Sequence, residues 1–215
     1  MGDRMAIGVF GGTFNPVHMG HLRVAEEIRE DFRLETIYFL PSHLPPHKDT
    51  NSAAVSGDRL KMLKAAIKGN PFFKVSDLEI KRGGVSYTIE TLKKLGRRFN
   101  DIYFVIGIDA FRLIDTWYHY EELFYHTGFI VMTRPASGHL NIPEMLPENV
   151  LTRLTALKDN IYRHESGKMI YLRPVTKIDI SSTKIRELHK GDRSIKYLVP
   201  PLVEKIIIER GLYRS

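Results

Sequence analysis

The sequence predicts an α/β protein built on a Rossmann-like, doubly wound parallel sheet with helices on both faces. Two observations support this fold class. Short apolar runs rich in β-branched residues alternate with segments whose apolar residues recur every three to four positions. The first apolar run ends in Gly11-Gly12, at a point where a strand passes into a helix. Such alternation is typical of a parallel sheet covered on both faces, with nucleotides bound at the carboxyl ends of its strands.

Each expected element rests on a local pattern. The expected strands are residues 5–10, 36–40, 74–80, 102–106, 129–132 and 169–172. The expected helices start near residue 22 or cover residues 59–67, 89–99, 117–125, 182–189 and 201–209. The last helix begins at a proline and stops before a glycine, which are usual boundary signals. Residues 42–56 form a long polar connection, and connections of this length are usually functional.

Length and composition limit the possible functions. The 215 residues fit a single domain, 1–215, in which we expect a C-terminal helical part, about 181–215, to pack on the sheet. The absence of cysteine excludes disulfides, thiolate metal sites and a cysteine nucleophile. No apolar run approaches the roughly 20 residues of a membrane helix, and we expect a cytoplasmic protein without a membrane partner. The formal charge of +7 is scattered, so no nucleic-acid partner is expected.

Residues 11–21 read Gly-Gly-Thr-Phe-Asn-Pro-Val-His-Met-Gly-His and predict a phosphate-binding segment. His18 and His21 are three positions apart, so they share one face of the helix that follows. The free N–H groups and positive dipole end of that helix favour an anion. Metal ligation is an alternative, but the sequence offers no third and fourth ligand at zinc spacing. Ordinary surface histidines are the other alternative.

Residues 180–186, Ile-Ser-Ser-Thr-Lys-Ile-Arg, form a second candidate site at a helix start. Hydroxyl groups there are ordinary helix caps. Cations in the first turn are unfavourable, because they lie near the positive end of the helix dipole. A bound phosphate reverses this effect by accepting bonds from Ser182, Thr183 and Arg186. The alternative is a capped helix with surface cations.

Together, the two motifs resemble the HxGH nucleotidyltransferase superfamily, whose members transfer a nucleotidyl group from a nucleoside triphosphate and release pyrophosphate. Residues 40–48, 83–92, 107–110 and 117–118 are similar to segments of the bacterial nicotinate-mononucleotide adenylyltransferases. The resemblance runs from residue 7 to residue 213, and only residues 136–168 hold no motif of that family. Asn15 stands where many relatives carry Asp, so no role for a carboxylate is carried over.

The resemblance implies that the phosphate of nicotinate mononucleotide attacks the α-phosphorus of ATP, giving nicotinate adenine dinucleotide and pyrophosphate in NAD biosynthesis. The implied catalytic residues are His18, His21 and Arg186, with at least one imidazole cationic against the phosphates. The implied ATP contacts are Gly11, Gly12, Thr13, Phe14, Lys48, Ser182 and Thr183. The implied contacts to nicotinate mononucleotide are Thr88, Asp109, Trp117, Tyr118 and Arg134. Mg²⁺ is expected to bridge phosphate oxygens without a protein ligand.

Three alternatives stay open. A phosphopantetheine adenylyltransferase shares both motifs, but residues 86–88 and 117–118 favour nicotinate mononucleotide. A class I aminoacyl-tRNA synthetase fragment carries a similar His-x-Gly-His signature and binds nucleic acid, but this chain lacks a Lys-Met-Ser-Lys-Ser loop and room for an anticodon-binding domain. A nucleotide-binding sensor is the third. The residues do not decide between a monomer and a homo-oligomer.

Overall fold

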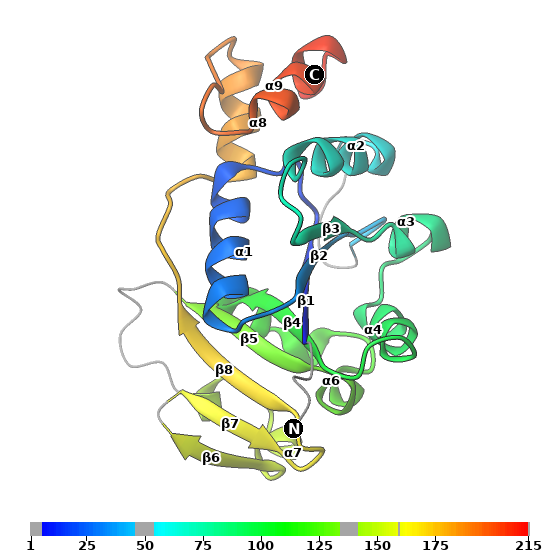
Figure 1. Cartoon of the computed structure of the whole chain (residues 1–215), viewed down its shortest axis with the longest axis vertical. Coiled ribbons are helices and arrows are strands. Elements are labelled where there is room, and N and C mark those ends of the chain that lie inside the picture. The colour runs from blue at the N-terminus through cyan, green and yellow to red at the C-terminus, as the bar shows by residue number, and fades with distance from the viewer. Residues whose placement is uncertain (1–5, 46–53, 134–141, 159, 215) are drawn as a thin grey trace.

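The computed structural model describes residues 6–45, 54–133, 142–158 and 160–214 of the chain. Within these residues, eight strands form one sheet (Figure 1). The strands are β1 (Ile7–Gly12), β2 (Thr36–Pro41), β3 (Phe73–Val75), β4 (Ile102–Gly107), β5 (Gly128–Thr133), β6 (Leu154–Lys158), β7 (Ile161–His164) and β8 (Met169–Pro174). The longer helices are α1 (Met19–Asp31), α2 (Ser56–Ala66), α4 (Thr88–Gly96), α6 (Tyr120–His126), α8 (Ser182–Lys190) and α9 (Pro201–Glu209). The shorter ones are α3 (Leu78–Arg82), α5 (Ile108–Phe111) and α7 (Glu148–Leu151).

The strand order is β3-β2-β1-β4-β5-β8-β7-β6. All pairs from β3 to β8 are parallel, so the predicted parallel sheet is confirmed. The chain moves outward from β1 to β3 and then returns to the other side of β1 at β4. This reversal is a topological switch point, where open α/β sheets bind ligands beyond the carboxyl ends of the strands. The carboxyl ends of β1 and β4 therefore define where a site is expected.

Two hydrophobic cores cover the two faces of the sheet, as the strand periodicity requires. On β1, Val9 belongs to one core, and its neighbour Phe10 belongs to the other. Leu92 of α4 and Leu123 of α6 pack into the first core. Ile28 of α1 packs into the second core, together with residues of α2, α8 and α9. The expected helical cover on both faces is confirmed.

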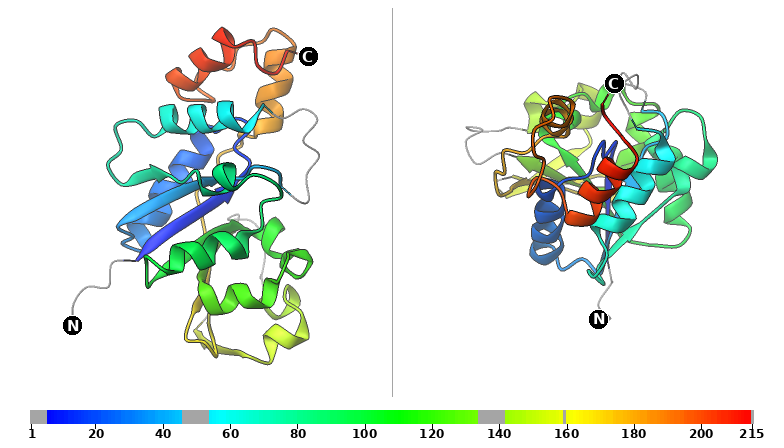
Figure 2. Two further views of the ribbon diagram at one scale, coloured as in Figure 1. Left: turned by 90° about the vertical axis from the view of Figure 1, so that its right-hand side faces the viewer. Right: turned by 90° about the horizontal axis from the view of Figure 1, so that it is seen from above.

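The C-terminal helices lie beyond the ends of the strands, where α9 runs over α2 in both views (Figures 1 and 2). Val203 and Ile207 of α9 share a core cluster with Met62 of α2. Arg210, just after α9, forms an ion pair with Asp58 of α2. The part that we expected to pack on the sheet, about 181–215, thus has α2 as the packing partner of its last helix.

Two elements differ from the sequence prediction. Residues 74–80 were expected to form one strand, but β3 ends at Val75 and α3 begins at Leu78. β3 pairs only with β2, so it is an edge strand. It has a neighbouring strand on one side only, and its register with that strand ends at Val75. Residues 117–125 were expected to be mostly helical. In the structure Trp117 is extended and His119 has a φ of 51°, so α6 begins only at Tyr120.

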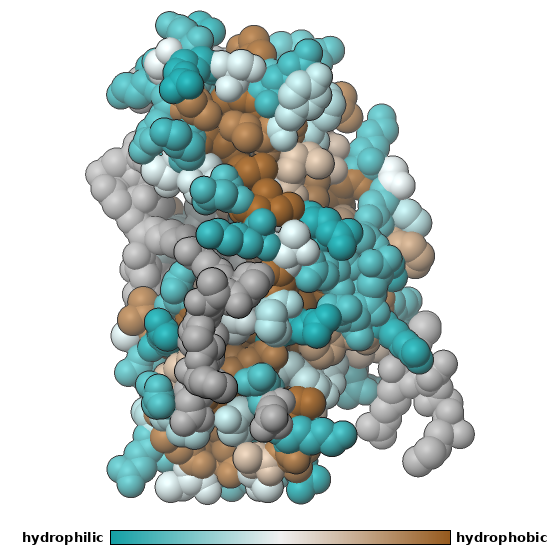
Figure 3. Space-filling view, turned by 90° about the vertical axis from the view of Figure 1, so that its left-hand side faces the viewer, coloured by the Kyte–Doolittle hydropathy of each residue, from teal (hydrophilic) through white to brown (hydrophobic). Residues whose placement is uncertain are grey.

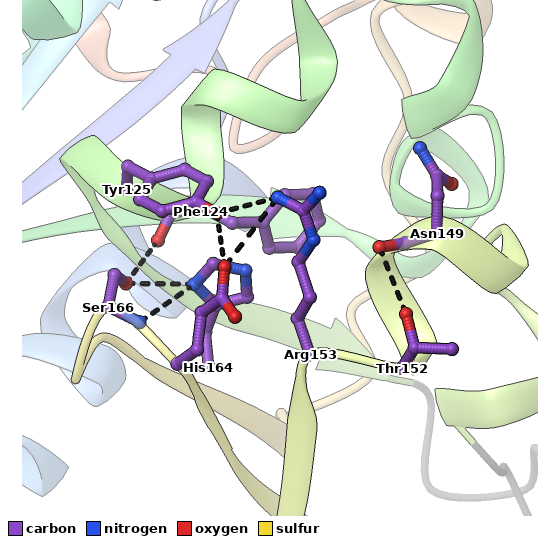
Figure 4. A network of polar contacts seen from close by, with 8 residues as sticks. Phe124, Tyr125, Asn149, Thr152, Arg153, His164 and Ser166 are labelled. Atoms are coloured by element: carbon purple, nitrogen blue, oxygen red, sulfur yellow. Dashed lines mark hydrogen bonds and ion pairs between the residues drawn. The ribbon is translucent and has the colours of Figure 1, made fainter.

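An antiparallel hairpin of β6 and β7 extends the sheet beyond β8, within the stretch that carries no recognised motif. Polar contacts join this hairpin to α6 (Figure 4). The Tyr125 hydroxyl donates to the Glu165 carboxylate and accepts a bond of 2.6 Å from Arg153 Nη1. Ser166 Oγ donates to the Phe124 carbonyl over 2.8 Å. The hairpin is therefore fixed by side chains, at a distance from the switch point.

The surface is mixed in character. The face shown in Figure 3 carries hydrophilic residues over most of its area, with a strip of apolar residues in its upper part. Across the described ranges, no helix has both the length and the apolar content needed to cross a membrane.

Candidate active site

A cavity of about 600 Å³ lies at the carboxyl ends of β1, β2 and β4, at the switch point of the sheet. The sequence-predicted residues that line it are Gly11, Gly12, Thr13, Thr88, Asp109, Trp117 and Tyr118. They come from segments that are far apart in the chain, since residues 11–13 lie at the end of β1 and residues 107–118 begin at the last residue of β4. The cavity thus unites the glycine motif with the segments that we expected to bind an acceptor.

Glycine is needed at position 11 because of close packing. A Cβ atom on Gly11 would lie 2.8 Å from Cζ of Phe104, which is too close for a real contact. Phe104 also lines the cavity and meets Trp117 edge-on, with the ring centroids 6.1 Å apart. Phe104 was not among the predicted site residues. Its position in an apolar strand predicted a core residue. Only the sheet topology shows that it also bounds the cavity.

Trp117 and Tyr118 line one side of the cavity from the non-helical stretch before α6. The ring of Tyr118 packs against that of Tyr87 with the centroids 4.4 Å apart. Tyr87 precedes Thr88, the first residue of α4. The turn before α4 and the turn before α6 are therefore in direct contact, although about 30 positions separate them in the sequence.

The two histidines meet at the first turn of α1, outside the cavity lining. Their rings stack with centroids 3.6 Å apart, and the backbone N–H of His18 donates to Nδ1 of His21 over 3.2 Å. Because Nδ1 accepts this bond, His21 carries its hydrogen on Nε2. Nδ1 of His18 is buried without a hydrogen-bond partner among the described residues. Burial lowers the pKa of His18 to about 4, so its ring is neutral at pH 7 in the protein alone.

The ring of Phe14 packs against the ring of His21. Phe14 is 2% exposed and has a φ of 50°, which turns the chain sharply after the glycines. Its ring meets the His21 ring edge-on at 5.1 Å and packs on Phe10 and Phe39 of the second core. The sequence predicted a backbone contact to ATP from this residue. The structure adds a packing role, which is to set the plane of the His21 ring.

The start of α8 is bound directly to the loop before α1. Ser182 Oγ donates to the Pro16 carbonyl over 2.8 Å, and Arg186 Nη1 donates to the Asn15 carbonyl over 2.9 Å. Nη2 of Arg186 also lies 3.4 Å from the Thr183 hydroxyl. The two predicted phosphate motifs therefore lie side by side, although more than 160 positions separate them. Neither α1 nor α8 has an acidic residue in its first turn.

A buried arginine that the sequence did not indicate holds this loop from the other side. Arg59 of α2 is 2% exposed, and burial lowers its pKa. Its guanidinium donates to the carbonyls of Thr13, His43 and Ala54 over 2.8, 3.1 and 3.1 Å. Because the peptide group is planar and trans, the N–H of Phe14 points away from Arg59. No sequence pattern distinguishes this arginine from a surface cation of an amphipathic helix.

Asn15 ties the same loop to the end of the chain. Its Oδ1 accepts bonds from the Ala54 N–H over 3.0 Å and from the Tyr213 hydroxyl over 2.8 Å. Burial raises the pKa of Tyr213, so its hydroxyl keeps the proton that it donates. A neutral amide oxygen is sufficient for both contacts. Asn15 therefore has a structural role that needs no carboxylate.

Two predicted site residues, Lys48 and Arg134, lie outside the described residues. Within the described part of the chain, no three His, Asp or Glu side chains gather into a cluster that could hold a metal ion. One acidic residue that the sequence analysis did not single out, Glu79 of α3, lines the cavity. It is 3% exposed, and a buried carboxyl group at a cavity wall is a functional candidate.

Comparison with known proteins decides the family. Residues 9–188 match the family model described as cytidylyltransferase-like, which is more than half of the chain. The chain belongs to the cytidylyltransferase-like family. The match covers both phosphate motifs and every predicted element from β1 to most of α8. This family assignment agrees with the resemblance to the HxGH nucleotidyltransferases that the motifs indicate.

Two relatives of this cytidylyltransferase-like chain carry the same name. A probable nicotinate-nucleotide adenylyltransferase of Syntrophotalea carbinolica is 42% identical over 215 residues, which is 98% of each chain. A protein of the same name from Desulfatibacillum aliphaticivorans is 40% identical over 216 residues, covering 97% of this chain and all of the relative. The solved structure of Plasmodium falciparum nicotinic acid mononucleotide adenylyltransferase complexed with NaAD matches this chain with a TM-score of 0.69 at 22% identity, and the match covers 97% of each chain. That structural likeness shows the fold.

Proposed function

We propose that the protein transfers the adenylyl group of ATP to the phosphate of nicotinate mononucleotide, giving nicotinate adenine dinucleotide and pyrophosphate, a reaction of NAD biosynthesis. The names of relatives at 40% and 42% identity support this activity. One structural observation gives this proposal its main support. Residues 11–13 line an aromatic cavity on one side and lead on the other to the start of α1, against which the start of α8 is packed. One segment thereby serves two neighbouring sites, as a two-substrate transfer needs.

The chemistry needs no protein nucleophile. The acceptor phosphate is already an anion, and one of its oxygens forms a bond to the α-phosphorus of ATP. The bond between that phosphorus and the oxygen that bridges to the β-phosphate breaks, and both electrons leave with pyrophosphate. The protein therefore has two tasks, which are to hold two anions in line and to stabilise the charge that develops on the leaving group.

The starts of α1 and α8 suit the polyphosphate. In our proposal His18 and His21 donate to the α- and β-phosphates, and Arg186, Ser182 and Thr183 hold the β- and γ-phosphates. Helix N–H groups and a guanidinium are both strong donors to phosphate oxygens. His21 keeps a hydrogen on Nε2 for this purpose, because its Nδ1 is already an acceptor. The buried His18 binds first as a neutral donor, and a nearby phosphate then raises its pKa.

The cavity suits the acceptor ring. The described residues that line it include four aromatic side chains and two carboxylates, and no lysine or arginine. The nicotinate ring of a mononucleotide carries a formal positive charge on its nitrogen, and a cation is favoured by aromatic faces and by carboxylates. We propose that Trp117 stacks on the ring and that Thr88 and the Tyr118 N–H bind its carboxylate. Asp109 is proposed to bind a ribose hydroxyl.

Mg²⁺ completes the proposal as an ion carried by the triphosphate. The donor set fits this arrangement, since the first turns of α1 and α8 lack carboxylates and the described residues offer no acidic cluster. Phosphate oxygens and waters are the usual ligands of Mg²⁺ in such sites. When bound, the ion neutralises charge on the leaving pyrophosphate. Lys48 and Arg134, which the structure does not describe, are proposed as further contacts to the triphosphate and to the acceptor.

The activity is tested by measuring pyrophosphate release with MgATP and three separate acceptors, which are nicotinate mononucleotide, its amide and phosphopantetheine. We expect release with the first and much less with the other two. A carboxylate needs hydrogen-bond donors, whereas the amide also presents a donor of its own. Equal turnover of the acid and the amide would contradict the proposed carboxylate contacts. Release with phosphopantetheine alone would replace the acceptor altogether.

A further inference from the structure

The buried carboxyl group of Glu79 stands behind the turn that begins α4. Thr91 Oγ1 donates to Glu79 Oε1 over 3.0 Å. Burial raises the pKa of Glu79, and the nearby hydroxyls of Ser86 and Thr91 lower it again. One hydroxyl from just before α4 and one from within α4 therefore face the same carboxylate.

These two hydroxyl groups lie on either side of Thr88. Ser86 comes two residues before it, and Thr91 follows one helical turn later. Ser86 is held from the opposite side as well, because its Oγ accepts from the His43 N–H over 2.7 Å and its own N–H donates to the Leu44 carbonyl over 2.9 Å. The position of Thr88 at the cavity wall thus depends on contacts to Ser86 and Thr91.

Arg82 completes the surroundings of the carboxylate. Its guanidinium lies 3.4 Å from the Thr91 hydroxyl and forms an ion pair of 3.0 Å with the exposed Glu90. The positive charge of Arg82 is therefore shared with a surface carboxylate. What distinguishes Glu79 from Glu90 is that only Glu79 is buried at the cavity wall.

From this arrangement we infer that Glu79 is the positioning residue of the acceptor site: by binding the hydroxyls of Ser86 and Thr91, its carboxylate holds the Ser86–Thr88 turn in the form that receives the carboxylate of a pyridine mononucleotide. This inference rests on the proposed function. A carboxylate accepts from both hydroxyls at once with either oxygen, whereas an amide offers one acceptor and one donor. The turn is thus expected to lose its fixed geometry when the acid is replaced by its amide.

The test compares Glu79→Gln with Glu90→Gln, a matched control in the first turn of α4. Trp117, the only tryptophan of the chain, lines the cavity, so quenching of its fluorescence reports binding of nicotinate mononucleotide directly. In Glu79→Gln we expect the Kd and KM for nicotinate mononucleotide to rise about tenfold, the effect of one lost hydrogen bond to a charged group. The kcat and the KM for ATP stay within about twofold of wild type. Glu90→Gln leaves all four values unchanged.

Unchanged binding of nicotinate mononucleotide by Glu79→Gln overturns the inference. So does an equal loss of affinity for ATP and for the acceptor, because that pattern marks general damage to the fold. If Glu79→Gln does not fold, Thr91→Val removes one of the two hydroxyls at nearly constant volume, and its acceptor Kd is then expected to rise while its ATP affinity does not. Failure of the proposed function is recognised separately, since wild type then neither binds nicotinate mononucleotide nor releases pyrophosphate with it.

Discussion

The guanidinium of Arg186 donates a hydrogen bond of 2.9 Å to the carbonyl oxygen of Asn15, a residue 171 positions earlier in the chain. Asn15 lies in the loop that precedes the stacked histidines of α1. The contact therefore links the end of the chain to the geometry of the phosphate motif. A second bond, from Ser182 to the Pro16 carbonyl, fixes the same loop. The loop before the first helix is thus held by the start of the eighth.

Replacement of Arg186 by alanine is expected to lower kcat/KM for pyrophosphate release by the equivalent of about 2–4 kcal/mol, which is the usual effect of losing one preorganised donor to a developing charge. The loop at Asn15 loses a restraint at the same time. Lys190→Ala, on the exposed last turn of the same helix, is the control and is expected to stay within about twofold of wild type. Activity of Arg186→Ala equal to that of the control would remove Arg186 from the site.

Gly20→Ala is expected to reduce activity about tenfold with little change in stability. A Cβ at this position would lie 3.1 Å from Nδ1 of His18, so the ring must shift by a few tenths of an ångström. Misplacement of a contact group on this scale impairs positioning catalysis. Gly57→Ala in α2 is the matched control, because its Cβ would meet nothing within 4 Å. We expect the control to keep full activity and to gain up to about 1 kcal/mol of stability. Steady-state kinetics and urea denaturation of both variants measure these effects.

The burial of His18 predicts a loss of stability in acid. Its pKa is lowered to about 4 in the folded chain, while the ordinary value is 6.5. Between these values the unfolded chain binds a proton that the folded chain does not, so the free energy of unfolding falls as the pH drops from 6.5 towards 4. At about 1.4 kcal/mol per pH unit, the loss reaches about 3 kcal/mol. In His18→Gln, the free energy of unfolding measured by urea denaturation is expected to fall by about 3 kcal/mol less than in wild type over the same pH range. Parallel pH profiles for the two proteins would show that His18 titrates normally.

Arg59→Gln is expected to destabilise the protein by about 3 kcal/mol or more. Three partly buried carbonyl groups lose their donor, and each acceptor left unsatisfied costs roughly 1–3 kcal/mol. The loop at Thr13 is freed as well, so the KM for ATP is expected to rise. Arg173→Gln breaks an exposed ion pair with Asp31 and is expected to cost less than about 1 kcal/mol. Denaturation midpoints that coincide for Arg59→Gln and Arg173→Gln would contradict the buried role of Arg59.

Much of the fold follows from periodicity that is visible along the chain. Strands with partners on both sides, such as β1 and β4, are continuous apolar runs, and their positions were predicted to within about two residues. The edge strand β3 and the hairpin of β6 and β7 were less visible, because their exposed residues leave no clear apolar pattern. Backbone turns also escaped prediction, as at His119, where a positive φ delays the start of the expected helix to Tyr120.

The candidate phosphate motifs, residues 11–21 and 180–186, were recognisable in the sequence because each combines particular residue types at short spacing, which is what contact with a ligand is expected to require. Residues whose role comes from burial could not be found in this way. Glu79 and Arg59 look like ordinary surface charges in the sequence, since nothing local shows which side of a helix a folded chain covers. The tertiary structure alone decided that Phe104 bounds the cavity and that Arg186 reaches Asn15, because both facts depend on which strands and helices become neighbours after folding.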